Sequence, residues 1–244
     1  MNFLLGLFAN ESGLTYRLAG MWRCGSSLFR ALEANEHRCN WDEGRGRDDD
    51  CPMATGHKKP RIIAGEAGGR RLAVPPGDGV RPTSDRVKES VFSALGPGRL
   101  VGARVLDLYA GSGALGLEAL SRGAAAALLV ERDAAAVRAI RANIVSLGFE
   151  ERATLRVATV AAVLGGPGPA ATFDLVLLDP PYDTPASEVE GALRLLGAEA
   201  WTASDATVVV ERAAGSPPVE WPEGWGSTWE RCYGDTLVLF AQRK

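Results

Sequence analysis

The sequence has few of the residues that build metal centres and disulfide frameworks. Its 244 residues include four cysteines and two histidines, and no two cysteines form a C-x-x-C pair. The spacings among Cys24, Cys39, Cys51, His37 and His57 match no zinc-binding pattern. We therefore expect no metal site, and the scattered cysteines are typical of free thiols in a reducing compartment such as the cytoplasm.

A long apolar run is also missing. Residues 3–8 form a short apolar stretch that cannot span a bilayer, and no positive charge precedes it as in a signal peptide. The sequence contains 46% hydrophobic residues and has a formal net charge of −3, which argues against a disordered chain and against a protein coated in positive charge. We expect a soluble, monomeric, cytoplasmic protein with no membrane partner.

Positive charge is concentrated in one segment. Residues 58–88 contain eight basic and three acidic residues, a balance of +5, whereas residues 105–244 contain eleven basic and eighteen acidic residues, a balance of −7. A basic segment beside an acidic body suits a protein that meets a polyanion on one face. A solvated, arginine-rich linker is the competing interpretation.

The pattern divides the chain into three regions. Residues 1–57 lack apolar periodicity and predict a poorly ordered N-terminal extension, so a chain that starts at Met53 should suffice for folding. Residues 58–98 predict a small basic hairpin, with strands at 61–65 and 69–74, and then a helix over 85–95. Either Thr83 or Ser84 can cap this helix.

Residues 99–244 alternate between apolar strands and helices. Strands are expected at 104–109, 126–131, 153–157, 174–179 and 206–212, helices at 114–122, 134–147 and 187–196, a short helix after 157, and a closing antiparallel pair at 229–233 and 236–242. Strands separated by helices predict an α/β fold with a mostly parallel, doubly wound sheet.

A glycine loop follows the first of these strands. Gly111, Gly113 and Gly116 satisfy G-x-G-x-x-G between a strand and a helix, and Glu131 ends the next strand twenty residues after Gly111. The glycines let a ligand approach the backbone, and the acid can accept both ribose hydroxyls. This arrangement predicts an adenosine-containing ligand, but it leaves NAD and S-adenosylmethionine as alternatives.

A second motif, Asp179-Pro180-Pro181-Tyr182, follows the fourth strand. The prolines remove two N–H donors, so the Asp179 carboxylate and the Pro180 carbonyl stand as acceptors without a competing donor. An exocyclic amino group of a base needs such a pair of acceptors, and Tyr182 offers a flat face on which that base can stack. In a doubly wound sheet this turn lies next to the glycine loop. The motif therefore favours a base amino-methyltransferase.

These residues carry a family resemblance. The segments 107–116 and 179–182, together with Glu131, resemble motifs I, II and IV of class I amino-methyltransferases. The chain resembles one family in particular, RsmD, the 16S ribosomal RNA guanine-N2 methyltransferases of bacteria, through four further segments: 61–65, 69–72, 81–89 and 115–123. The likeness runs from about residue 61 to residue 242, and residues 1–57 have no counterpart in the family.

The resemblance implies a Rossmann-like, seven-stranded class I fold that binds S-adenosylmethionine, preceded by a small β-hairpin that contacts small-subunit 16S rRNA. The family usually places an acid near the adenine amino group after the third strand, whereas this chain has Thr159 there. The implied cofactor residues are Asp107, Gly111, Gly113, Glu131 and Thr159. Asp179, Pro180 and Tyr182 would hold the flipped guanine. The implied RNA contacts are Arg61, Arg70, Arg71, Arg81 and Arg86, and the region from 58 to 98 would also cover the cofactor pocket.

Three other functions share part of this pattern. DNA amino-methyltransferases usually begin the Pro-Pro-Tyr motif with Asn and carry a large target-recognition insertion, which this chain lacks between Gly113 and Asp179. Protein-glutamine methyltransferases also favour Asn at that position. A noncatalytic ribosome-assembly factor would bind RNA through residues 58–88 without consuming cofactor.

Overall fold

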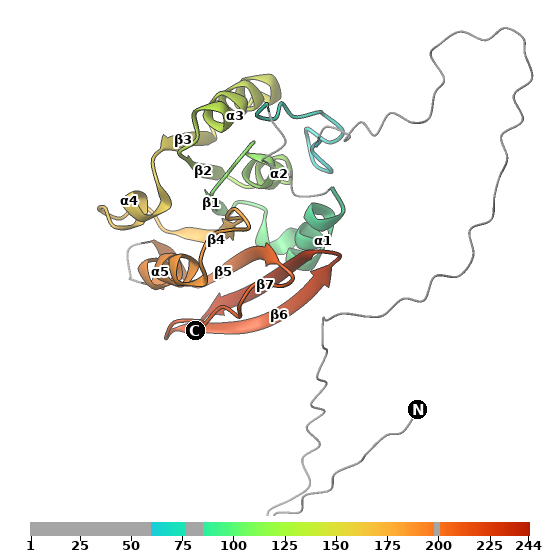
Figure 1. Cartoon of the computed structure of the whole chain (residues 1–244). Coiled ribbons are helices and arrows are strands. Elements are labelled where there is room, and N and C mark those ends of the chain that lie inside the picture. Colours follow the sequence, from blue (N-terminus) through green and yellow to red (C-terminus); the bar gives the residue numbers. More distant parts are fainter. Residues whose placement is uncertain (1–59, 77–84, 198–200) are drawn as a thin grey trace, which may run out of the picture. The chain divides into compact units, whose positions relative to one another are not determined.

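A seven-stranded sheet organises the part of the chain that the computed structural model describes, residues 60–76, 85–197 and 201–244 (Figure 1). The strands are β1 (Arg104–Leu108), β2 (Ala126–Glu131), β3 (Ala153–Val157), β4 (Phe173–Leu178), β5 (Thr202–Ala213), β6 (Trp225–Tyr233) and β7 (Thr236–Arg243). Their order is β3-β2-β1-β4-β5-β7-β6; the first five are parallel, and β7 runs antiparallel to β5 and β6. The predicted doubly wound α/β sheet is confirmed.

The helices also follow the predicted alternation. They are α1 (Asp85–Leu95), α2 (Ala114–Ser121), α3 (Ala134–Leu147), α4 (Val160–Leu164) and α5 (Ala186–Gly197), with a short 3-10 turn, η1 (Pro97–Arg99). Local signals fix their ends: the Asp133 carboxylate caps α3 by accepting from the N–H groups of Ala135 and Ala136, and Gly148 ends it with φ 76°. The predicted extension 1–57, Arg81 and the caps Thr83 and Ser84 lie outside the described residues.

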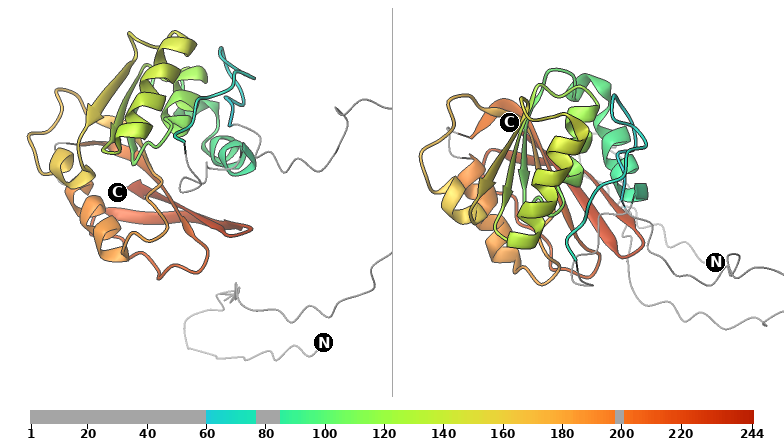
Figure 2. Two further views of the ribbon diagram at one scale, coloured as in Figure 1. Left: turned by 45° about the horizontal axis from the view of Figure 1, so that its top comes forward. Right: turned by 90° about the horizontal axis from the view of Figure 1, so that it is seen from above.

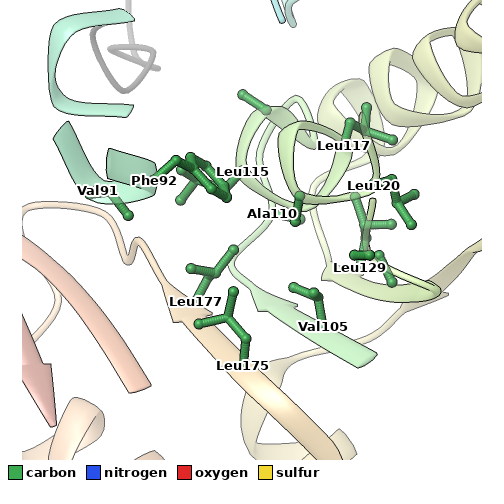
Figure 3. Close-up of a cluster of buried hydrophobic side chains, with 14 of the residues drawn as sticks. Val91, Phe92, Val105, Ala110, Leu115, Leu117, Leu120, Leu129, Leu175 and Leu177 are labelled. Atoms are coloured by element: carbon green, nitrogen blue, oxygen red, sulfur yellow. The ribbon is translucent and has the colours of Figure 1, made fainter. Parts of the chain in front are cut away.

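Alternating side chains of the central strands divide the core into two layers. The ribbon views show helices on both faces of the sheet (Figure 2). Val105, Leu175 and Leu177 pack with α1, α2 and α3 on one face, as the close-up of this cluster shows (Figure 3). Leu106 and Val176 pack with α4 and α5 on the other face. Because both faces are covered, the strands read as continuous apolar runs in the sequence.

Some strand bounds differ from the predicted ones. β5 begins at Thr202 and β6 at Trp225, before the predicted starts at 206 and 229, because exposed polar residues at their beginnings mask the strand pattern. The strands predicted to end at Tyr109 and Asp179 end one residue earlier, at Leu108 and Leu178. The residues after β1 and β4 are therefore free to take the loop conformations of a site.

The basic hairpin is present but much shorter than predicted. Arg61 and Arg71 form a single antiparallel bridge, flanked by hydrogen bonds from Ile62 N to Arg70 O at 2.9 Å and from Leu72 N to Pro60 O at 2.8 Å. The strands predicted at 61–65 and 69–74 are wrong beyond this bridge. The reason is a competing acceptor: the N–H groups of residues 63 and 64 donate to the Glu118 carboxylate of α2, at 2.6 and 3.1 Å.

Candidate active site

The loops that carry the two sequence motifs meet at one edge of the sheet. β1 and β4 are adjacent parallel strands, with Leu108 paired to Leu178, and the sheet order reverses at this point. The Asp179 N–H donates to Leu108 O at 3.4 Å, so the Asp-Pro-Pro-Tyr turn starts beside the glycine loop. The predicted proximity of the two motifs is confirmed, at the position where doubly wound sheets bind ligands.

The glycine loop has one packed and one open position. Gly113, with φ 79°, would place a Cβ 3.0 Å from a Leu129 methyl group and 3.1 Å from one of Leu117, so its lack of a side chain serves the core. Gly111, with φ 57°, has only Tyr109 O within reach of such a Cβ, at 4.0 Å. Backbone at Gly111 is thus accessible to a ligand, as a cofactor loop requires.

Asp107 lies beneath this loop and is completely buried. Its Oδ2 accepts a hydrogen bond from Gly116 N at 2.8 Å, whereas Oδ1 has no hydrogen-bond partner within the described part of the chain. Burial raises the pKa of Asp107 to about 7, the Gly116 N–H opposes this rise, and the charges of Asp179 and Glu131 add to it. The carboxylate braces the start of α2, and its predicted contact with the cofactor stays a prediction.

The Asp107 carboxylate leaves no room for a side chain at Gly116. A Cβ at Gly116 would lie 2.9 Å from Oδ2 of Asp107. The third glycine of the motif therefore serves the contact between the strand and the helix, and only Gly111 remains open for a ligand.

Glu131 organises the loop from the neighbouring strand. Its Oε2 accepts from Gly111 N at 2.8 Å, and its Oε1 accepts from the N–H groups of Arg132 and Asp133, at 2.7 and 2.8 Å. A carboxylate has about four lone-pair sites, so one remains for a further donor such as a ribose hydroxyl. The half-buried acid fits the predicted cofactor contact and also holds the loop in place.

Thr159 is exposed at the carboxyl end of β3, next to Glu131. The preceding residue, Ala158, donates its N–H to Glu131 O at 3.1 Å. The Thr159 hydroxyl caps α4 by accepting from Ala162 N at 3.2 Å, which leaves its own hydrogen available to donate. The edge formed by β1, β2 and β3 therefore carries donors and acceptors that fit the cofactor.

The Asp-Pro-Pro-Tyr turn forms the other part of the site. Asp179 is half-buried, Pro180 is buried, and the Tyr182 ring is exposed, with 44% of its surface accessible. Arg212 of β5, which is 3% exposed, supports the turn by donating to Thr184 O at 3.2 Å. An exposed aromatic ring on a held loop suits stacking of an incoming base.

Tyr109 is a site residue that the sequence reasoning missed. It has φ 62°, the one positive value among the described non-glycine residues, directly between β1 and the glycine loop. Its hydroxyl donates to Glu188 Oε1 of α5 at 3.0 Å, and burial, followed by this carboxylate, raises the pKa of Tyr109 above its usual range. A backbone strained at this place links the cofactor loop to the helix after the Asp-Pro-Pro-Tyr turn.

Buried polar groups attach the basic hairpin to the domain. Lys88 of α1 is completely buried, donates to the Arg61 carbonyl, and lies 3.9 Å from the Glu118 carboxylate and 3.8 Å from that of Asp85. Burial lowers the pKa of Lys88, and the two acids oppose this effect. Arg122 also donates to Glu118, at 2.6 Å. The hairpin is thus fixed on α2.

A second attachment joins the segment after the hairpin to the glycine loop. Asn143 of α3, 1% exposed, accepts from Ala73 N at 2.7 Å and donates to the carbonyls of Ala73 and Ser112, both at 2.9 Å. Sequence reasoning missed Asn143, because only the three-dimensional arrangement brings its partners together.

The predicted RNA-binding arginines differ in their surroundings. Arg61 and Arg71 are exposed bridge partners, so their side chains lie on the same face of the hairpin. Arg61 also pairs with Asp85 at 3.3 Å, and Arg70 donates to the carbonyl of Ser146 at the end of α3. Arg86 is exposed on the first turn of α1, and Arg81 lies outside the described residues.

Metal-binding clusters and membrane-spanning helices are both absent from the described ranges. No group of three or more His, Cys, Asp or Glu side chains in residues 60–76, 85–197 and 201–244 is arranged to hold a metal ion. Within those ranges, no helix has the length and apolarity needed to cross a membrane.

Comparisons with known proteins find one family of related proteins. The family described as conserved hypothetical protein 95 matches residues 60–242. The chain is 37% identical to "Ribosomal RNA small subunit methyltransferase D" of Escherichia coli strain K12 over 195 residues. The aligned region covers 79% of this chain and 94% of that protein. The protein of the same name from Haemophilus influenzae is 37% identical over 175 residues, 71% of this chain and 89% of its own length.

A solved structure shows the same likeness in three dimensions. The Escherichia coli protein "Putative methyltransferase yhhF" superposes with a TM-score of 0.66 at 36% sequence identity, covering 76% of this chain and 98% of its own. The similarity therefore covers the described sheet and the hairpin, and it begins at about the residue where the sequence pattern becomes regular.

Proposed function

This chain belongs to the RsmD family of S-adenosylmethionine-dependent methyltransferases, and we propose that it methylates the exocyclic N2 amino group of a guanine in 16S rRNA of the small ribosomal subunit. The observation that carries the proposal is the contact between the two motifs. Asp179 N bonds to Leu108 O at the end of β1, so the Asp179 and Pro180 acceptors that we assign to the base lie close to the open backbone of Gly111.

The cofactor side has the donors and acceptors that S-adenosylmethionine needs. We assign the remaining acceptor site of Glu131 to a ribose hydroxyl, Thr159 to the adenine edge, and the Gly111 and Gly113 loop to the methionine portion. Asp107 supports this loop by accepting from Gly116 N. The bound cofactor supplies an activated methyl group whose bond to sulfur breaks on transfer.

On the substrate side, the residues orient a weak nucleophile. The lone pair of the guanine amino nitrogen is delocalised into the ring, and acceptance of both N–H groups by Asp179 and the Pro180 carbonyl directs it toward the methyl carbon. The nitrogen forms the new bond to carbon and releases one proton to water, so we assign no residue as a general base. Tyr182 stacks on the flipped guanine.

Substrate specificity is tested by nucleoside mass spectrometry. The protein is incubated with S-adenosylmethionine and, separately, with small-subunit particles, free 16S rRNA and duplex DNA. We expect N2-methylguanosine from one of the RNA substrates and no methylated base from DNA. A methylated adenine or cytosine, or methylation of DNA alone, would overturn the substrate assignment, and absence of any product would favour a noncatalytic assembly factor.

We also propose that the protein acts as a monomer in the cytoplasm, where ribosomal subunits are assembled. The lone described cysteine, Cys232, is exposed and forms no disulfide, as a reducing compartment allows. Analytical ultracentrifugation at micromolar concentration should give the mass of one chain, 25.8 kDa. A mass of twice that value would contradict the monomer.

A further inference from the structure

A cleft of about 290 Å³ lies between the first turn of α1 and the end of β6 with the turn that follows it. We call it the arginine cleft; its described lining consists of Arg86, Val87, Arg231, Cys232, Tyr233 and Gly234. Figure 1 shows α1 beside the tip of the β6–β7 hairpin. Two of the lining residues, Arg86 and Arg231, are exposed cations from parts of the chain far apart in sequence.

The arginine cleft lies at the same sheet edge as the active site. β7 starts opposite the end of β5, with Thr236 paired to Ala213, and Ala214 N donates to Asp235 O at 2.8 Å. The β6–β7 turn is therefore at the carboxyl edge of the parallel strands, where Asp179 also lies. In the strand order, Glu131 is on one side of β4 and this turn is on the other. The base site thus lies between the cofactor residues and the cleft.

The chemistry of the cleft suits an anion. The guanidinium carbon of Arg231 lies 5.6 Å from the centroid of the Tyr233 ring, and that ring packs against the core beneath, so the ring provides a fixed support for the cation. Among the described residues, neither Arg86 nor Arg231 takes part in an ion pair. The Asp85 carboxylate beside Arg86 is directed to Arg61 and Lys88 instead.

The composition of the cleft favours a phosphate group. The cleft measures about 290 Å³ and is open to solvent, so it has room for a phosphate. Two guanidinium groups are the side chains that bind phosphate most specifically, through paired N–H donors.

We propose that the arginine cleft binds a backbone phosphate of the RNA strand close to the guanosine that is methylated. This proposal rests on the proposed function, because a flipped guanine at Asp179 brings its neighbouring phosphates to the same sheet edge. The β6–β7 hairpin thereby becomes a second RNA contact, separate from the basic hairpin at 61–72. Phosphate contacts position a nucleic acid, and bases bound elsewhere select it.

The test compares two double variants that remove the same charge. R86Q/R231Q changes the arginine cleft, and R138Q/R141Q changes two exposed arginines of α3 as the matched control. RNA affinity is measured by fluorescence anisotropy over a series of salt concentrations. For R86Q/R231Q we expect binding weaker by at least about tenfold, the effect of losing a single charge-assisted hydrogen bond, and a salt slope smaller by about 0.7 for each phosphate that is no longer neutralised. The control should match the wild type.

The outcomes separate this proposal from the proposed function. If R86Q/R231Q binds RNA as the control does, the cleft proposal is overturned, even when the wild type makes N2-methylguanosine. If the double variant weakens S-adenosylmethionine binding by calorimetry and leaves RNA binding intact, the cleft belongs to the cofactor and the proposal fails. If RNA binding falls as expected while the wild type yields a different product, the phosphate-binding role of the cleft is supported and the guanine assignment fails.

Discussion

The proposed cofactor side and the proposed substrate side of the site differ in burial and in the groups that form them. On the cofactor side, Asp107 is completely buried and Glu131 accepts three backbone N–H groups, so most of the framework is main chain. On the substrate side, Tyr182 is 44% exposed, and the side chain of Arg61 is 58% exposed. Behind both, buried polar groups such as Lys88 and Arg212 hold the loops.

This difference follows from the two ligands. A small cofactor of one shape can be met by a framework that is formed before binding, which limits the ordering cost. A large, charged RNA would arrive from solvent, and the residues that we propose for its binding are exposed cations and an exposed ring. Substitutions on the cofactor side should therefore change stability and cofactor affinity together, whereas those on the substrate side should change RNA binding or turnover alone.

The largest effect is expected for Glu131→Ala. The change removes the acceptor of three backbone N–H groups and of the assigned ribose hydroxyl. S-adenosylmethionine affinity, measured by calorimetry, should fall by about 1.5–3 kcal/mol for each charge-assisted hydrogen bond removed, and the melting temperature should fall as well. Glu150→Ala, which changes an exposed acid in the loop between α3 and β3, is the control. Unchanged cofactor binding, or preference for NAD, would refute the cofactor assignment.

Asp107→Asn should change how stability depends on pH. The pKa of Asp107 is raised from 3.8 to about 7, chiefly by burial. The folded state thus holds a proton that the unfolded state releases between these values, and the contribution of Asp107 to wild-type stability falls as the pH rises from about 4 to 7. Asparagine does not ionise, so the variant lacks this pH-dependent loss of stability.

Urea unfolding across this pH range is the measurement. The stability of the variant relative to the wild type should increase with pH, by at most about 1.4 kcal/mol for each pH unit. Parallel pH profiles for the two proteins would show that Asp107 ionises with an ordinary pKa.

Tyr182→Ala tests the substrate side. Loss of the exposed ring should weaken binding of the RNA substrate by about 1–3 kcal/mol, the usual value for one stacked base. Tyr182→Phe should lose far less, because the ring face carries the contact. Cofactor affinity and melting temperature should stay at wild-type values in both variants. A large loss with phenylalanine would mean that the hydroxyl, and not the ring, is recognised.

The smallest effect is expected for Tyr109→Phe, which removes the hydrogen bond to Glu188 that joins the two sides. The free energy of unfolding should fall by about 0.5–1.5 kcal/mol. A double-mutant cycle with Glu188→Ala isolates this pair, because alanine removes the acceptor. A coupling energy near zero would show that the link contributes nothing.

Much of this molecule could be predicted from local sequence signals. The bounds of β2, β3 and α3 follow from apolar periodicity and from Asp133 and Gly148 at the helix ends. The meeting of the glycine loop and the Asp-Pro-Pro-Tyr turn follows from the topology of a doubly wound sheet, because both motifs come directly after neighbouring parallel strands.

The features that escaped prediction depend on partners far away in the chain. The basic hairpin has one bridge because Glu118, more than fifty residues later, takes its N–H groups. The support of the Asp-Pro-Pro-Tyr turn by Arg212 and the strained backbone of Tyr109 likewise have no local signature. Such residues become visible only when burial and hydrogen bonding are known.

The central claim is that the Asp-Pro-Pro-Tyr turn addresses the base and not the cofactor. Asp179→Ala tests it most directly when two quantities are measured on the same preparation: the single-turnover rate of RNA methylation and the calorimetric affinity for S-adenosylmethionine. We predict that the rate falls by at least about a hundredfold, as expected when a nucleophile is no longer aligned, while cofactor affinity stays close to the wild-type value. An undiminished rate, or a loss of cofactor affinity as large as the loss of rate, would contradict the claim.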